Sequence, residues 1–120
     1  MDQRAGRQFR VRGRNDVRRL FERGRRAGDR VLTLYGIRNG LAQARLGVAV
    51  SARHGGAVRR NRIKRLCREA FRLIRCRLPA GWDYMILPRV GVECSLQRVQ
   101  ASLQTLAPRL AQGTDPGADE

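Results

Sequence analysis

The sequence is poor in side chains that bind metals or form catalytic pairs. His54 is the only histidine, and the three cysteines, Cys67, Cys76 and Cys94, form no CxxC pair. A structural zinc site needs four suitably spaced Cys or His ligands, so no metal site is predicted in the protein alone. Free thiols are ordinary in a reducing cytosol, and Cys67 is expected in the core.

Long hydrophobic runs are also missing. No apolar stretch approaches the roughly 20 residues that a membrane-spanning helix needs. The N-terminal segment MDQRAGRQFRVRGR is basic but has no apolar region of the kind found in secretory signals. These absences predict a cytoplasmic protein without a membrane partner.

Catalytic patterns are absent as well. Asp83 and Glu93 have no partner at a recognisable spacing, and His54 has no Ser or Cys nucleophile in a known motif. No glycine-rich loop of the P-loop type is present. An enzyme that acts alone is therefore disfavoured, and no catalytic residue is predicted.

Positive charge is what the chain has in excess. The sequence contains 26 Lys and Arg residues but only 10 Asp and Glu residues, which gives a formal net charge of +16. Lys64 is the only lysine. A compact domain of this charge repels itself unless a polyanion neutralises it, so nucleic acid is the predicted partner. Two explanations fit the preference for arginine: the guanidinium group suits phosphates and bases, or the genome favours arginine codons.

The first half of the chain predicts a helix followed by two strands. A helix over residues 16–23 is expected to be capped by Asn15 and to stop at Gly24. A strand at 30–37, an Asn-Gly turn and a returning strand at 45–51 follow. One face of the returning strand carries only small residues (Gly47, Ala49 and Ser51), which leaves room for either a packed helix or a ligand.

Residues 57–74, AVRRNRIKRLCREAFRLI, predict an amphipathic helix with a strongly basic side. At about 100° per residue, two opposing sectors separate. The apolar sector contains Ile63, Leu66, Cys67, Ala70, Phe71, Ile74 and Leu78, and the basic sector contains Asn61, Lys64, Arg65, Arg68, Arg72 and Arg75. Arg59 and Arg60 lie at the apolar azimuth, so they are expected beyond the edge of the core, projecting over the sheet.

The remaining residues predict a further strand at 81–88 and a last helix, capped by Ser95 and ending near Pro108. Together these elements predict an α+β fold in a single domain, a sandwich of one small sheet with helices packed on one side. Residues 1–112 are expected to form this domain, with 1–13 basic and partly irregular. Residues 113–120 are expected to form an acidic disordered tail.

The motif RRNRIKRLCREAFR, residues 59–72, resembles the protein component of bacterial ribonuclease P. The matching residues are Arg60, Asn61, Arg62, Lys64, Arg65, Arg68, Glu69, Phe71 and Arg72. The resemblance extends from the first predicted helix to the last. It leaves out only the first dozen residues and the acidic tail.

This resemblance implies an RNA-binding subunit that assists a catalytic RNA in removing the 5′ leader from precursor tRNA. The RNA and its bound Mg²⁺ ions would perform the hydrolysis, and no protein partner would be required. The resemblance also implies a left-handed crossover through the long helix, although most crossovers between parallel strands are right-handed.

The resemblance divides the expected contacts into two sets. The catalytic RNA would contact Arg59, Arg60, Asn61, Arg62, Lys64, Arg65, Arg68 and Arg72. A cleft for the single-stranded leader would comprise Arg12, Arg14, Val17, Phe21, Leu34, Tyr35, Ser51, Arg53 and Arg89. Many family members have an aromatic residue where Val17 stands and two lysines where Ala52 and Arg53 stand. Two roles are open for Phe21, a platform for a leader base or a member of the core.

Three other functions share part of this pattern. A structural RNA-binding protein would carry the basic helix but would not need a separate cleft for a single strand. A DNA-binding regulator of the helix-turn-helix type would place a short helix and turn before the basic helix, and none is evident. A self-sufficient nuclease would need its own catalytic residues.

Overall fold

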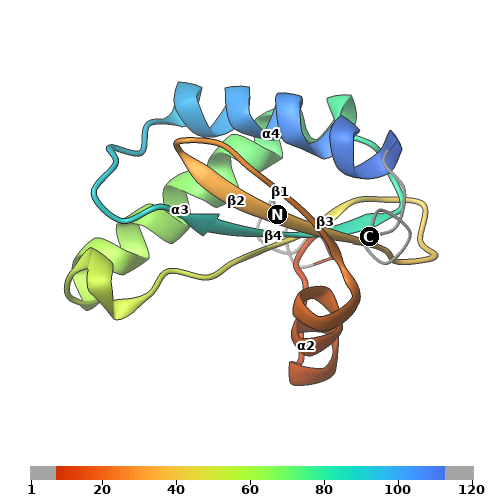
Figure 1. Ribbon diagram of the computed structural model, residues 1–120, viewed down its shortest axis with the longest axis horizontal. Coiled ribbons are helices and arrows are strands. Elements are labelled where there is room, and N and C mark those ends of the chain that lie inside the picture. Colours follow the sequence, from red (N-terminus) through yellow and green to blue (C-terminus); the bar gives the residue numbers. More distant parts are fainter. Residues whose placement is uncertain (1–7, 113–120) are drawn as a thin grey trace.

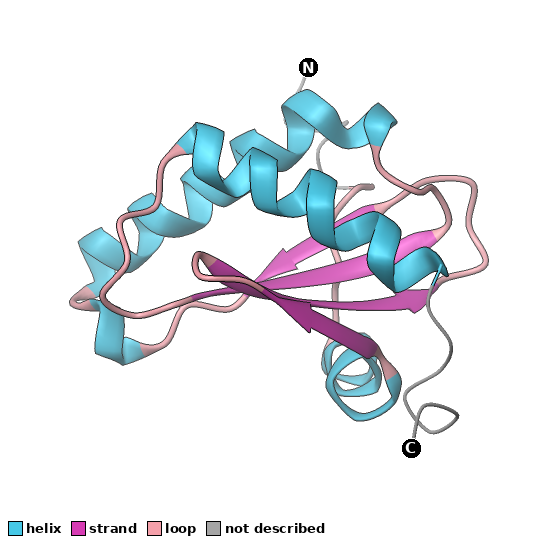
Figure 2. Cartoon of the chain, turned by 45° about the horizontal axis from the view of Figure 1, so that its top comes forward, coloured by secondary structure: helices cyan, strands magenta, loops and turns pink. Residues whose placement is uncertain are grey.

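The computed structural model describes residues 8–112, which form one four-stranded sheet with helices on both faces (Figures 1 and 2). The elements in chain order are α2 (Arg14–Arg23), β1 (Arg25–Gly28), β2 (Leu32–Arg38), β3 (Arg45–Val48), the 3-10 turn η1 (Ala52–His54), α3 (Ala57–Ile74), the 3-10 turn η2 (Arg75–Arg77), β4 (Trp82–Pro88) and α4 (Leu96–Gln112). The strand order is β1-β2-β4-β3. Only β3 and β4 are parallel, and the chain connects them through α3. The predicted α+β fold is confirmed.

The core lies between the sheet and the helix pair α3 and α4. Alternate residues of the two central strands face this layer, among them Leu34 of β2 and Ile86 of β4, both fully buried. The helices contribute their predicted apolar stripes: Cys67, Ala70, Phe71 and Ile74 from α3, and Val99, Leu103, Leu106 and Leu110 from α4. Burial raises the pKa of the Cys67 thiol to about 12, so this cysteine stays protonated and acts as a core residue.

The predicted hairpin between residues 30–37 and 45–51 is wrong, because β4 lies between β2 and β3. Six of the seven residues of β4 are buried, which is typical of a strand that is covered on both faces and therefore central. β1 was not predicted at all. Its sequence, RRAG, has no strand pattern, and pairing with β2 rather than intrinsic propensity makes it a strand.

The predicted position of the first helix is also wrong, since α2 lies on the face of the sheet opposite α3 and α4 (Figure 1). Its predicted cap is wrong as well. The helix begins at Arg14, and Gly13, with φ of 84°, occupies the N-cap position without a side-chain hydrogen bond. Gly13 serves there because that backbone conformation is strained for other residues.

The last helix begins as predicted but ends later. Arg98 N donates a hydrogen bond to Ser95 Oγ at 3.2 Å, which confirms the cap. The helix passes through Pro108 and ends at Gln112. Leu106, Ala107 and Leu110 are buried on either side of the proline, and this packing offsets the hydrogen bond that the proline cannot donate. The predicted acidic tail lies outside the described residues.

Candidate nucleic-acid interface

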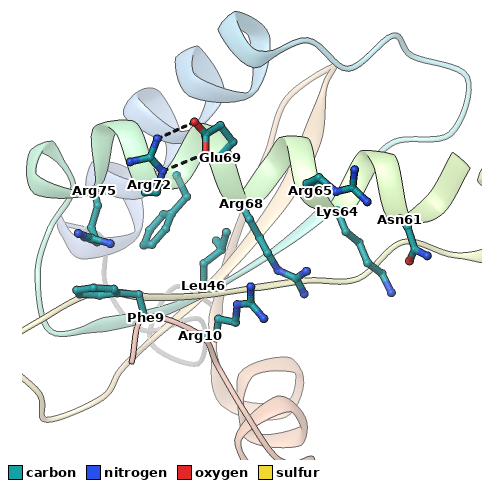
Figure 3. Close-up of a pocket in the computed structure, with 11 residues that line it drawn as sticks. Phe9, Arg10, Leu46, Asn61, Lys64, Arg65, Arg68, Glu69, Arg72 and Arg75 are labelled. Carbon is teal, nitrogen blue, oxygen red and sulfur yellow. Dashed lines mark hydrogen bonds and ion pairs between the residues drawn. The ribbon is translucent and has the colours of Figure 1, made fainter. Parts of the chain in front are cut away.

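A basic groove of about 560 Å³ runs between α3 and the segment that precedes α2 (Figure 3). The groove is lined by Phe9, Arg10, Leu46, Asn61, Lys64, Arg65, Arg68, Glu69, Phe71, Arg72 and Arg75. The predicted basic sector of α3 therefore forms one wall. Phe9 and Arg10, together with Leu46 of β3, line the other.

Backbone hydrogen bonds hold residues 8–11 at the open edge of β3. Leu46 N donates to Phe9 O at 2.7 Å, and Val11 N donates to Leu46 O at 3.0 Å, as in a parallel strand pair. The Arg75 guanidinium lies 3.5 Å from the centroid of the Phe9 ring, a cation–π contact that ties this segment to the end of α3. The segment thereby places Arg10 opposite the basic wall.

Phe9 and Arg10 were not among the residues predicted to bind RNA, whereas Arg75 belonged to the predicted basic sector. A signal was present, since Phe9 and Val11 alternate around Arg10 with the period of a strand. Three residues are too few to establish that period. The partner edge, at Leu46, lies far along the chain.

The groove has a strong excess of positive charge. Six cations line it, and the only acid among its lining residues, Glu69, pairs with Arg72 through two hydrogen bonds of 3.0 and 2.7 Å. The side chains of Arg10 and Arg68 extend toward each other (Figure 3). Burial, and then the Arg10 charge, lower the pKa of Arg68, and the Arg68 Nε atom is buried without a hydrogen-bond partner. Because converging cations are unfavourable alone, this groove suits an anion such as a phosphate.

Not all the residues predicted to contact the catalytic RNA share this groove. Asn61, Lys64, Arg65, Arg68 and Arg72 line it. Arg59 and Arg62 instead lie against the loop at 90–94, on another side of α3, and Arg60 is half-buried. The helical azimuth of Arg62 is about 40° from Leu66 and about 120° from Arg68, so the sequence already carried the signal for this separation.

A second candidate surface lies on the face of the sheet that carries α2. Leu20 anchors the helix and is fully buried, whereas Phe21 is 38% exposed. The Phe21 ring meets Tyr35 of β2 edge to face, with 4.9 Å between centroids. Val17, one turn before Phe21, is half-buried. Phe21 is therefore not a plain core residue, and an aromatic pair borders this face.

Leu34 does not belong to this surface, and its assignment is wrong. Successive residues of a strand point to opposite faces, so only one of Leu34 and Tyr35 can face α2. Leu34 is fully buried in the core beneath α3 and α4. Tyr35 takes the surface position.

The other residues predicted for the cleft are exposed. Arg12 shares a hollow with Arg10 and Arg45, and Arg14 lies beside Val17. Ser51 and Arg53 follow β3, and Arg89 follows β4, where its Nε donates to Asp29 O. These side chains come from separate segments of the chain.

The sequence left either a packed helix or a ligand to cover the small-residue face of residues 45–51. Neither of them covers Gly47, the first residue of that face. A Cβ atom on Gly47 would lie 2.6 Å from Met85 Cε and 3.5 Å from Val11 Cβ. The methionine side chain of the neighbouring strand therefore covers Gly47. Ala49 is half-buried, and only Ser51 is exposed.

A buried ion pair fixes the sheet beneath α2. Arg45 donates from Nε to Asp83 Oδ1 at 2.8 Å and from Nη2 to Asp83 Oδ2 at 2.6 Å. Arg45 Nη2 also lies 3.4 Å from Asp16 Oδ2 on α2. The hydrogen bond to Asp83 raises the pKa of Arg45. Asp83 is therefore a structural acid, and Arg45 links it to the helix that borders the cleft.

The described residues offer no obvious metal centre. Among residues 8–112, no three His, Cys, Asp or Glu side chains gather closely enough to hold a metal ion. No helix in this part of the chain is long and apolar enough to cross a bilayer.

Comparisons with known proteins agree with this geometry. The family model described as Ribonuclease P matches residues 6–111. The ribonuclease P protein component of Pelotomaculum thermopropionicum is 38% identical over 95 residues, covering 78% of this chain and 85% of that protein. The solved ribonuclease P protein from Thermotoga maritima superposes with a TM-score of 0.76 at 30% identity, covering 83% of this chain and 96% of that one. The protein from Staphylococcus aureus gives a TM-score of 0.72 at 27% identity, covering 87% and 95%.

Proposed function

The chain belongs to the ribonuclease P family, and on this premise we propose that it is the RNA-binding subunit of a holoenzyme that removes the 5′ leader from precursor tRNA. The observation that carries the proposal is the basic groove, in which six cations face one acid that is already paired. An RNA backbone supplies the missing negative charge. A rigid array of guanidinium groups suits A-form RNA, which proteins recognise mainly by shape and phosphate.

The α2 face supports a second contact, with the leader itself. Phe21 and Tyr35 present an aromatic pair at a partly exposed site. Base stacking on aromatic side chains is the usual way in which proteins hold single strands. Two separate surfaces therefore allow one chain to bind the catalytic RNA and the leader at the same time.

We assign the chemistry to the RNA subunit. Mg²⁺ takes six oxygen ligands in a nearly octahedral arrangement, and phosphate groups and water molecules commonly supply several of them. Phosphate oxygens of the RNA and the substrate would hold the ion, which activates water for hydrolysis. The protein's part is to bind and orient, in the cytoplasm and without another protein.

Reconstitution tests the proposal directly. The purified protein is mixed with a bacterial ribonuclease P RNA and precursor tRNA at low Mg²⁺, and leader removal is followed on a gel. We expect cleavage that depends on the protein. A structural RNA-binding protein would bind without accelerating cleavage, a DNA-binding regulator would prefer duplex DNA, and a self-sufficient nuclease would cleave without the RNA.

Replacing Arg65 and Arg68 by alanine is expected to weaken binding to the catalytic RNA. The salt dependence of binding should also fall, with the slope of log K against log salt decreasing by about 1 for each phosphate that is no longer neutralised. Filter binding at several salt concentrations measures both effects. Arg77→Ala removes an exposed charge outside the groove and is the matched control. An unchanged slope in a folded double variant would contradict the phosphate role of this face.

Replacing single acids is expected to leave the chemical step intact, since the RNA and its Mg²⁺ perform it. Asp16→Asn and Glu22→Gln change the two acids on α2, the helix nearest the cleft. Single-turnover cleavage at saturating protein and Mg²⁺ should show rate constants within about twofold of the unaltered protein, a range that corresponds to less than about 0.5 kcal/mol. A variant that binds substrate normally but cannot cleave would show that the protein takes part in the chemistry.

A further inference from the structure

Two arginines lie against the only tryptophan of the chain, at the side of the sheet formed by β1 and β2. The guanidinium carbons of Arg25 and Arg38 are 5.4 and 5.2 Å from the centroid of the Trp82 ring, as in cation–π contacts. Trp82 is buried, Arg25 is half-buried and Arg38 is exposed. These three residues are called the Trp82 cluster below. The basic groove borders β3, at the opposite edge of the sheet.

The last turn of α4 packs on the Trp82 cluster. Arg25 Nη1 donates a hydrogen bond to Leu110 O, and α4 crosses β1 and β2 (Figure 1). A Cβ atom on Gly36 of β2 would lie 2.9 Å from Leu110 Cδ1 and 3.3 Å from Trp82 Cε3. The helix ends at Gln112, two residues after Leu110. The chain therefore leaves α4 beside Arg25.

This end of the protein has more positive charge than its described acids neutralise. Arg109, in the last turn of α4, adds a further exposed cation. Within residues 8–112, no acid forms an ion pair with Arg38 or Arg109. Asp29, in the connection between β1 and β2, already accepts hydrogen bonds from Val31 N and Leu32 N. The cluster therefore requires a counter-ion from outside the described residues.

The residues that follow α4 supply such charges. The sequence GTDPGADE, residues 113–120, contains Asp115, Asp119 and Glu120 and no cation. Three residues of chain span at most about 10 Å, so Asp115 comes within reach of Arg25, and the later acids reach farther. The C-terminal end of a helix carries partial negative charge. Acids directly after α4 are thus unfavourable unless nearby cations neutralise them.

Tethering decides whether such weak contacts form. A single exposed ion pair contributes little, but a short flexible tether holds its acids at an effective concentration in the millimolar range. An unrelated RNA also gains little from two exposed arginines, and salt screens that gain. The acids therefore compete with RNA at the Trp82 cluster on nearly equal terms. They do not displace RNA from the basic groove, where six cations act together.

We propose that the acidic segment 113–120 binds the Trp82 cluster as an intramolecular counter-ion and keeps RNA off this side of the protein. RNA is thereby confined to the basic groove and the α2 face. The inference rests on the proposed function in one respect, that the excluded polyanion is RNA. The contact between the segment and the cluster is independent of that function.

Trp82 reports this contact directly, because the only tryptophan gives a single indole N–H signal in a proton–nitrogen NMR spectrum. The tail-neutral variant, with Asp115→Asn, Asp119→Asn and Glu120→Gln, removes the charges of the full chain's tail without shortening it. We expect the Trp82 signal to move in this variant, by the same amount at every protein concentration. An unchanged signal would overturn the inference. A shift that varies with protein concentration would place the segment on another molecule and would overturn it as well.

Binding of an unrelated duplex RNA, measured at several salt concentrations, tests the exclusion of RNA. The tail-neutral variant should bind this RNA more tightly, and its slope of log K against log salt should steepen by about 1–2, since Arg25 and Arg38 become available to phosphates. Adding Arg38→Gln should reduce that steepening by about 1. Arg38 is exposed, so this substitution is compatible with folding, which thermal melts verify.

Arg98→Gln is the matched control. Arg98 is an exposed arginine near the other end of α4, about 18 Å from Leu110 along the helix. Tail neutralisation should keep its full effect when Arg98→Gln is present. An equal effect in the Arg38→Gln and Arg98→Gln backgrounds would show that the acids act through net charge alone, which would overturn the inference. Weaker binding of the catalytic RNA by Arg38→Gln in the otherwise unaltered chain would place RNA on the cluster, with the same consequence.

Leader removal by the reconstituted holoenzyme separates this inference from the proposed function. The tail-neutral variant should support cleavage at the unaltered rate, because the acidic segment does not occupy the basic groove. If neutralisation changes nothing while Arg65→Ala with Arg68→Ala still weakens binding, the proposed function stands and the counter-ion role is wrong. If the arginine double variant is also without effect, the proposed function is wrong, and the Trp82 signal still decides the contact.

Discussion

Arg45→Ala is expected to lower the free energy of unfolding by about 3–5 kcal/mol, the usual loss when one partner of a buried ion pair is removed. Asp83 is only 1% exposed, and both of its carboxylate oxygens receive hydrogen bonds from Arg45. Without Arg45 the buried charge would keep one side-chain donor, Asn39 Nδ2, at 2.9 Å from Oδ1. Urea unfolding followed by circular dichroism measures the loss.

The two halves of the pair are not equivalent, and this provides the control. The Arg45 side chain is 20% exposed and also lies near Asp16, so Asp83→Ala leaves a charge that water and Asp16 can still stabilise. Asp83→Ala should therefore cost less than Arg45→Ala. An apolar double variant, Arg45→Met with Asp83→Leu, should recover most of the stability, because no buried charge remains. If Arg45→Ala lowered the free energy of unfolding by less than about 1 kcal/mol, as is typical of exposed ion pairs, the stabilising role of the buried Arg45–Asp83 pair would be contradicted.

Phe21→Ala is expected to weaken binding of precursor tRNA by about 1–3 kcal/mol, or about 5–150-fold, while binding of mature tRNA stays the same. The ring is 38% exposed and rests on Tyr35 at 4.9 Å between centroids, so one of its faces can stack on a base. Mature tRNA has no leader. The difference between the two titrations therefore isolates the leader contact.

Two further variants separate stacking from folding. Leu20, the fully buried neighbour of Phe21, anchors α2, so Leu20→Ala should cost about 2–5 kcal/mol of stability, whereas Phe21→Ala should cost clearly less. Val17→Phe adds a ring one turn before Phe21 and should modestly tighten binding of the precursor alone. Equal weakening for precursor and mature tRNA, or a large drop in melting temperature for Phe21→Ala without selective loss of binding, would contradict the leader role.

Local periodicity determined much of this protein. The segregation of apolar and basic residues from 57 onward predicted α3 and its buried stripe, although the predicted sectors extended to Leu78 and the helix ends at Ile74. The Ser95 cap and the leucine stripe predicted α4, and strands β2 and β4 lie where apolar residues indicated them. These features depend on neighbours within a few residues, so they are legible in a sequence. The excess of arginine and the Arg-Asn-Arg motif likewise indicated an RNA-binding protein from residue types and spacing alone.

Contacts between distant segments decided the rest. Arg45 and Asp83 are 38 residues apart, and the Arg10 bridge to Leu46 spans a comparable separation. A pattern of alternation shows which residues of a strand share a face, but it does not show which strand lies beside it or which helix covers that face. For this reason the sequence by itself established the elements and the polyanionic partner. Only the tertiary structure placed β4 at the centre, turned Tyr35 instead of Leu34 toward α2, and separated the cations of α3 into two sets on different sides of the helix.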